Sequence, residues 1–394
     1  MTLVLSATWM QAALRSDTSP KDFYNTWSFT RAVVSDCSPY DLACRDNIIQ
    51  TQSSEEPVQL EVVEPPNLFT FFFWSTKFSL GAALEIWRCA SILLLLASLF
   101  LSRAMFQNNQ VISKSTSTVF WTLLIFINFA PASLDIQLGQ ISALVSFGLV
   151  LFAVLIKSYG LNSVWAGLAL SITLIKPNLL YLLYLYLTIE TLRTKSFRLI
   201  GGGLLGAVVM FGVPCLYRPS IMLEFWQAIS NYSTDMMRAT IGTWLRIWLG
   251  PDFVLLDYLL MPLSIIALGT WCLRRESRFT GSHKAVLVYL PLLSIISTPY
   301  CLPYDFVVLI PAMMWFVSRS ASIPASRRQL LCGSVVLLNQ YTFMQFSEMH
   351  QYAAYPWVVL ALCLLSDLTA GHTASQPKHS LPPRGTGGVV SNTA

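Results

Sequence analysis

Two uncharged stretches decide the class of fold. LIGGGLLGAVVMFGVPCLY (Leu199–Tyr217) and AVLVYLPLLSIISTPYCLPY (Ala285–Tyr304) contain no Asp, Glu, Lys or Arg, and Ile141–Ile156 is a third uncharged run. A helix that crosses a bilayer needs about 20 mostly apolar residues. No window alternates apolar and polar residues for long, which argues against an outer-membrane barrel. We therefore expect an all-α polytopic membrane protein.

The composition supports the same class. Of the 394 residues, 54% are hydrophobic and only 11% are charged, whereas a soluble domain carries about 25% charged residues. The net charge of +5 would suit a nucleic-acid partner, but the Lys and Arg residues gather at the ends of apolar segments. Basic residues in such places determine membrane topology, so we exclude a nucleic-acid-binding protein.

The apolar segments predict a bundle of about 11–12 transmembrane helices. They lie near 78–101, 118–133, 141–156, 163–175, 178–190, 199–216, 253–273, 285–298, 304–318, 329–345 and 352–368, with a first segment at 2–14 that is too short to cross. The short segments 163–175 and 178–190 predict a broken pair that leaves Lys176-Pro177 at membrane depth. Residues 1–370 are expected to form one transmembrane domain, and 371–394 a disordered cytoplasmic tail.

The charges are sorted by side. One alternate set of loops (102–117, 157–162, 191–198, 274–284 and 319–328) is strongly basic, and the positive-inside rule makes these loops cytoplasmic. The opposite set contains a long first outer loop, 15–77, with nine acids against five basic residues, and a second outer loop, 217–252. If the first outer loop faces an oxidising compartment, its Cys37 and Cys44 could form a disulfide.

Several clusters on the outer side could carry chemistry. Asp22 is followed by Tyr24 and other aromatic residues, so it is either a solvated acid beside an interfacial aromatic belt or a general base whose pKa burial raises. EPPNLFTFFFW (Glu64–Trp74) holds two prolines that forbid a regular helix, and its aromatic run is either a membrane anchor or a wall for a lipid substrate. Asp135 and Gln140 are expected at the outer mouth between two helices.

Lys176 is the most informative single residue. A lysine within an apolar stretch costs about 2.5–3.5 kcal/mol on insertion scales. It either extends its ammonium group to the interface or awaits an anionic group such as a lipid-linked phosphate. Arg238 and Arg246 in the second outer loop, and Tyr300 and Asp305 at the outer end of an apolar segment, complete a predicted outer-face pocket. No CxxC or HExxH pattern supports a metal site.

The order of these motifs resembles glycosyltransferase family 87. The motifs are DFY, EPP, GQ, an apolar KP, RxTxGxWxR and TPY…YD…LIP, and the similarity runs from about Lys21 to Pro311. The family contains α-mannosyltransferases that depend on polyprenol-phosphate mannose and have a GT-C-type membrane fold. The resemblance implies a catalytic acid in the first outer loop, which matches Asp22, and matches Gln140, Lys176 and Asp305 to the family's GQ, KP and late acid.

These expectations assign a role to each candidate. Asp22 is the expected catalytic base. The residues expected to bind the donor phosphate or sugar are Lys176, Gln140, Arg238, Arg246, Asp305 and Tyr300. The residues expected at the acceptor or in the pocket wall are Tyr24, Glu64 and Asp135. No metal or cofactor is expected.

The predicted function is an inverting membrane glycosyltransferase with a single catalytic domain. It would move a hexose, mannose by family analogy, from a polyprenyl-phosphate donor to a glycan or lipid-linked acceptor. The expected location is the plasma (inner) membrane, with the site on the non-cytoplasmic face. The alternatives are a carrier or flippase for lipid-linked glycans and a membrane polysaccharide polymerase. Only one short broken pair is visible, whereas transporters repeat such pairs.

Overall fold

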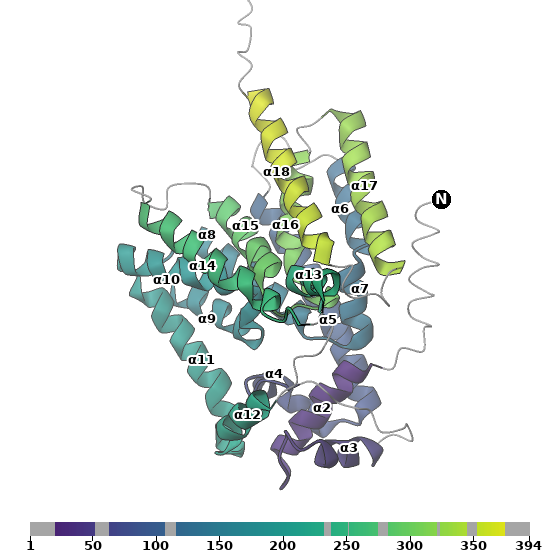
Figure 1. Cartoon of the computed structure of the whole chain (residues 1–394), viewed down its shortest axis with the longest axis vertical. Coiled ribbons are helices and arrows are strands. Elements are labelled where there is room, and N and C mark those ends of the chain that lie inside the picture. Colours follow the sequence, from purple (N-terminus) through teal and green to yellow (C-terminus); the bar gives the residue numbers. More distant parts are fainter. Residues whose placement is uncertain are drawn as a thin grey trace, which may run out of the picture.

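The structure is a computed structural model, and it describes residues 20–51, 63–106, 116–231, 238–250, 252–274, 283–320, 324–344 and 353–374. Every regular element in these ranges is a helix (Figure 1). The predicted all-α polytopic membrane fold is confirmed. The predicted first segment, 2–14, lies outside the described residues, as does the predicted tail beyond residue 374.

Four helices of the described chain are long and apolar enough to cross a membrane. They are α5 (Leu80–Phe106), α8 (Ser142–Tyr159), α11 (Phe197–Tyr217) and α14 (Leu256–Arg274). A fifth span is formed if α6 (Thr116–Ile127) and α7 (Ala130–Leu138), which are bent by 47°, count as one. Three further apolar stretches, Val164–Ile175, Leu287–Ser297 and Tyr355–Asp367, have only 10–17 residues each, so the count of 11–12 spans stays a prediction.

The remaining helices of the later chain pack against these spans. They are α15 (His283–Ser297), the 3-10 helix η4 (Pro303–Leu309), α16 (Ile310–Ser320), α17 (Ala325–Met344) and α18 (Tyr355–Ala374). Two buried segments, η4 and α16, form the centre, since nearly all their residues are shielded from solvent. This arrangement brings Asp305 of η4 into the middle of the molecule.

The predicted break at Lys176-Pro177 is confirmed. The first half consists of α9 (Val164–Ile172) and the 3-10 helix η2 (Thr173–Ile175), and the second of the 3-10 helix η3 (Pro177–Leu179) and α10 (Tyr181–Thr194). Pro177 cannot donate a backbone hydrogen bond and disfavours helical geometry in the residue before it. Lys176 therefore adopts a non-helical conformation, with φ −131° and ψ 71°.

Helices α9 and α11 approach each other through glycine. A Cβ atom added to Gly202 would lie 2.1 Å from the carbonyl oxygen of Val164, and one added to Gly167 would lie 2.2 Å from that of Leu199. Gly201 has open space around it. The glycine run within α11 thus serves backbone packing, as small residues do between membrane helices.

The described part of residues 15–77, the predicted first outer loop and called the first outer segment from here on, is largely helical. It contains α2 (Lys21–Val33), α3 (Leu42–Gln50), α4 (Leu68–Phe72) and the 3-10 helix η1 (Phe73–Lys77). The expectation that the two prolines forbid a helix in 64–74 is wrong, because they precede the first turn of α4, where a missing N–H group costs nothing. The second outer segment contains α12 (Ile221–Ser230) and α13 (Ile241–Leu249).

Candidate active site

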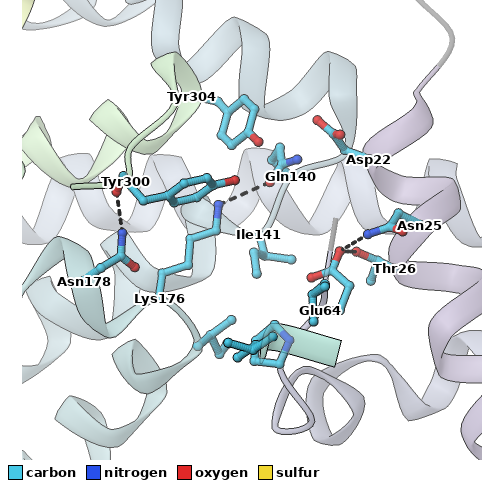
Figure 2. Close-up of a pocket in the computed structure, with 14 residues that line it drawn as sticks. Asp22, Asn25, Thr26, Glu64, Gln140, Ile141, Lys176, Asn178, Tyr300 and Tyr304 are labelled. Carbon is cyan, nitrogen blue, oxygen red and sulfur yellow. Dashed lines mark hydrogen bonds between the residues drawn. The ribbon is translucent and has the colours of Figure 1, made fainter. Parts of the chain in front are cut away.

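The described residues enclose a pocket of about 210 Å³ between the first outer segment and the broken span. Its polar lining comes from α2, from the segment before α4, from the turn after α7, from the break between η2 and η3, and from η4 with the loop that leads into it. Figure 2 shows Asp22 and Glu64 on the side of α2, and Lys176 with Tyr300 on the opposite side. Segments far apart in the sequence therefore meet in one polar cavity.

Lys176 projects from the break in the span into this pocket. Its Nζ atom lies 2.6 Å from Oδ1 of Asp305 and donates to Ser142 Oγ at 3.0 Å and to Gln140 Oε1 at 3.3 Å. The ammonium group also lies 4.8 Å from the centre of the Tyr304 ring. These partners offset the cost of burying a charged side chain, so an ion pair and hydrogen bonds hold the ammonium group of Lys176 in the protein.

Two asparagines fix the backbone around Lys176. Asn67 Nδ2 donates to the carbonyl oxygen of Leu174 at 3.0 Å, and Asn178 Nδ2 donates to that of Tyr300 at 2.6 Å. A broken helix exposes carbonyl groups that need partners. Asn67 supplies such a partner to the first half of the break, whereas Asn178 ties the second half to the loop at Tyr300.

Asp22 begins α2 on the far side of the pocket and is half-buried. The side-chain amide of Gln140 lies beside this carboxylate and, as a hydrogen-bond donor, favours its ionised form. Burial raises the pKa of Asp22 above its ordinary value, while the Gln140 hydrogen bond and the charge of Lys176 act in the opposite direction. The carboxylate is thus ionisable in a partly dry environment, as a general base requires.

Gly139, the residue before Gln140, allows this part of the chain to pack closely against α2. Gly139 ends α7 in the left-handed conformation, with φ 66°. A Cβ atom added there would lie 2.6 Å from Cβ of Phe23. Only glycine fits this contact, and it brings Gln140 beside Asp22, the neighbour of Phe23.

Glu64 is a second carboxylate in the pocket. Its Oε1 atom accepts from Asn25 Nδ2 at 2.7 Å and from Thr26 Oγ1 at 3.2 Å, and its other oxygen points toward the cavity (Figure 2). Behind it, buried Arg45 donates to both the carbonyl and the side-chain oxygen of Asn25. Burial raises the pKa of Glu64, opposed first by the charge of Arg45.

The structure brings together most of the expected donor-binding residues. Gln140, Lys176 and Tyr300 line the pocket, and Asp305 lies directly behind Lys176. Arg238 is one layer further out, where it donates to the carbonyl oxygen of Pro299 at 3.0 Å and lies 5.5 Å from the Tyr300 ring.

Besides Asp305 and Arg238, three expected residues do not line the pocket. Arg246 pairs with Asp257 at 3.3 Å, which ties α13 to α14. Asp135 lies inside α7 instead of at the outer mouth, and its Oδ1 atom accepts from the backbone N–H of Ala143 at 3.2 Å. It therefore caps the first turn of α8. Tyr24 is buried in the core.

Several pocket residues were missed in the sequence. Asn25 and Thr26 follow Asp22 by three and four positions, so all three share one face of α2. A helical period was present in this segment, but interpreting 15–77 as a loop hid it. Ile229 of α12 carries no chemical signal and could be found only from the structure.

No group of three or more His, Cys, Asp or Glu side chains within the described residues is arranged to hold a metal ion. The pocket itself presents carboxylates that face a cation. One carboxylate can accept a proton, and the cation can meet negative charge on a group that departs.

Comparison with known proteins identifies the pocket's context. The model of glycosyltransferase family 87 matches residues 64–340 of this chain. The match begins at Glu64, later than the expected start at Lys21, so it contains Gln140, Lys176 and Tyr300 but not Asp22. No curated protein and no solved structure matches the chain.

Proposed function

The chain belongs to glycosyltransferase family 87, and from that premise we propose that it transfers a hexose from a polyprenyl-phosphate sugar to a glycan or lipid-linked acceptor. Membership in the family makes the chain a membrane glycosyltransferase rather than a carrier. The donor class, mannose as the hexose, the plasma (inner) membrane and the non-cytoplasmic side of the site are parts of the proposal.

One observation carries the proposal. The pocket holds a partly buried cation, Lys176, across from a half-buried carboxylate, Asp22. A sugar phosphate needs a positive charge where its phosphate leaves, and the acceptor hydroxyl needs a base on the other face of the sugar. The two groups stand on opposite sides of the cavity (Figure 2), which supports inversion at the anomeric carbon.

The proposed reaction is a single displacement. The acceptor oxygen attacks the anomeric carbon, the bond from that carbon to the phosphate oxygen breaks, and Asp22 takes the acceptor's proton. Polyprenyl phosphate leaves with the electron pair of the broken bond. Its growing negative charge is met by Lys176, so a protonated leaving group is not needed.

The other polar groups would position the sugar. Gln140 touches both Lys176 and Asp22, so it lies between the leaving group and the base. Glu64 presents a carboxylate oxygen to the cavity and suits a sugar or acceptor hydroxyl that donates to it. Asp305 holds Lys176 in place at 2.6 Å.

The test is transfer of labelled hexose from a polyprenyl-phosphate hexose by the purified protein in lipid. We expect Asp22→Asn to lower kcat by about 100-fold or more, the usual contribution of a general base, with little change in donor KM. Asp41→Asn is the matched control, because Asp41 caps α3 in the same segment and does not line the pocket.

Full turnover by a folded Asp22→Asn variant would show that another group is the base. Absence of transfer from every polyprenyl-phosphate hexose by the unaltered protein would overturn the donor class itself.

A further inference from the structure

Helix α12 contributes an exposed residue to the edge of the pocket. Ile229, in the last turn of α12, lines the pocket and is 46% exposed. The exposed apolar residues Leu223 and Trp226 precede it on the same short helix. An apolar rim beside a polar cavity suits a ligand that is polar at one end and hydrocarbon at the other.

Few apolar contacts hold this helix. Ile221 is its one buried residue, packed against Phe29, Val33 and Phe69 of the first outer segment. Burial of a single side chain stabilises the docked position only weakly. The place of α12 must therefore depend on other contacts.

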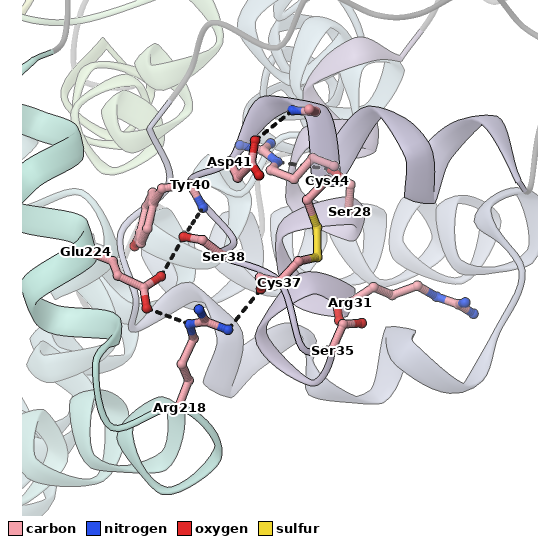
Figure 3. The surroundings of a disulfide bond; sticks show 12 residues. Ser28, Arg31, Ser35, Cys37, Ser38, Tyr40, Asp41, Cys44, Arg218 and Glu224 are labelled. Atoms are coloured by element: carbon pink, nitrogen blue, oxygen red, sulfur yellow. Dashed lines mark hydrogen bonds and ion pairs between the residues drawn. A yellow bond between two sulfur atoms is a disulfide. The ribbon is translucent and has the colours of Figure 1, made fainter.

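These contacts are polar and are made by Ser38, Arg218 and Glu224, which we together call the latch (Figure 3). Glu224 of α12 accepts from Arg218 Nε at 2.7 Å and from Ser38 Oγ at 2.5 Å. Arg218, just before α12, also donates from Nη1 to the carbonyl oxygen of Cys37 at 2.9 Å. The side chains of Arg218 and Glu224 are 19% and 17% exposed, so water screens this pair less than a surface pair.

The partners of the latch lie in a loop closed by a disulfide. Cys37 and Cys44 are bonded, with 6.2 Å between their Cα atoms, which confirms the pairing left open in the sequence. The cross-link restricts the freedom of the intervening residues, including Ser38. A rigid loop is the better anchor for a weakly packed helix.

The same loop also contacts a residue that lines the pocket. The backbone N–H of Tyr40 donates to Ser38 Oγ at 3.2 Å, and the Tyr40 hydroxyl donates to the carbonyl oxygen of Glu64 at 3.1 Å. Its ring lies 5.9 Å from that of Phe225 on α12. One loop thus contacts both the backbone of Glu64, a residue that lines the pocket, and the helix at the rim.

We infer that the disulfide-closed loop, through the Ser38–Glu224–Arg218 latch, positions α12 as the rim over which the donor's lipid chain enters the pocket. Glu224 and Arg218 are positioning residues, since they act through α12 and not on the reacting atoms. The inference deepens the proposed function and rests on its lipid-linked donor.

The first experiment separates binding from chemistry in the transfer assay. Glu224→Gln keeps the shape of the side chain and removes the charge, and we expect it to raise donor KM about five-fold with kcat within about two-fold. The paired change Cys37→Ser with Cys44→Ser should act in the same direction. The increase should be larger for a long-chain polyprenyl donor than for a short-chain analogue.

The matched control is Glu85→Gln. Glu85 pairs with Arg88 on α5 at the same 2.7 Å as the latch pair, but it is 67% exposed and away from the pocket. It should leave KM and kcat unchanged. An unchanged donor KM in Glu224→Gln would show that the latch does not position α12 for donor binding. An equal rise in KM for the long-chain and short-chain donors would show that α12 does not contact the lipid chain.

A second measurement needs no donor. A cysteine placed by Ile229→Cys is labelled with a water-soluble maleimide, and the modified peptide is followed by mass spectrometry. Glu224→Gln should raise the labelling rate several-fold, whereas Glu85→Gln should not. Equal labelling rates in Glu224→Gln and Glu85→Gln would show that the latch does not position α12, whichever donor the protein uses. A raised labelling rate in Glu224→Gln, with no transfer by the unaltered protein, would contradict the proposed function alone.

Discussion

Asp22 and Gln140 form the contact on which the proposed chemistry depends most directly. They come from segments more than a hundred residues apart, and Gly139 allows them to meet because its backbone packs on Phe23. The hydrogen bond favours the ionised carboxylate, whereas burial favours the neutral acid. The balance of these two effects determines the pH at which a base at position 22 is active.

Removing the hydrogen bond should therefore move the pH profile. In Gln140→Ala, the pKa of Asp22 should rise further, because an interaction that lowers it is lost. A base works only when ionised, so activity falls as pH drops through its pKa, and the acid limb of kcat/KM should shift to higher pH. Gln137→Ala is the control, since Gln137 does not line the pocket. A limb that stays in place or shifts to lower pH contradicts the role of Asp22.

At the scale of elements, the contact between α9 and α11 shows why the glycines of α11 are not equivalent. Gly202 faces the backbone of α9 at Val164, whereas Gly201, one residue earlier, faces open space. Helix α9 leads into the break at Lys176, so a shift of α9 would also move the pocket cation.

Gly202→Ala should destabilise the protein by about 1–3 kcal/mol, as overpacking does, because its Cβ would lie 2.1 Å from a carbonyl oxygen. Gly201→Ala should be neutral or slightly stabilising, since alanine favours helix over glycine. Thermal melting in detergent compares the two variants. Equal melting temperatures would mean that the two helices can separate without cost.

At the scale of the whole molecule, the sorted charges predict which side of the membrane carries the pocket. The disulfide between Cys37 and Cys44 agrees with an oxidising compartment on the side of the first outer segment. Asp22, Glu64 and the latch lie in or against this segment, so its side decides where the reaction takes place.

Cysteine labelling tests the orientation. In a Cys89→Ser background, which removes an exposed thiol, Thr51→Cys should react with an impermeant reagent added outside intact cells. Thr280→Cys, in the basic loop 274–284, should react only after the membrane is opened. Labelling of both positions from the cytoplasmic side would overturn this topology.

The sequence by itself determined the features that depend on composition and local chemistry. Uncharged runs predicted the helices, Pro177 predicted the break beside Lys176, and loop charges predicted an orientation, because each effect acts within a few residues. Aromatic and acidic residues in the first outer segment pointed to Asp22 in the same way.

Only the tertiary structure decided which polar groups meet. Lys176 and Arg246 are both cations near apolar helices. Lys176 faces the pocket beside Asp305, whereas Arg246 forms an ion pair with Asp257. Asp135 became a helix cap, and Ile229 became part of the rim. Buried polar groups require partners, and long-range packing decides which partners are within reach, so local sequence could propose the members of the site but not select among them.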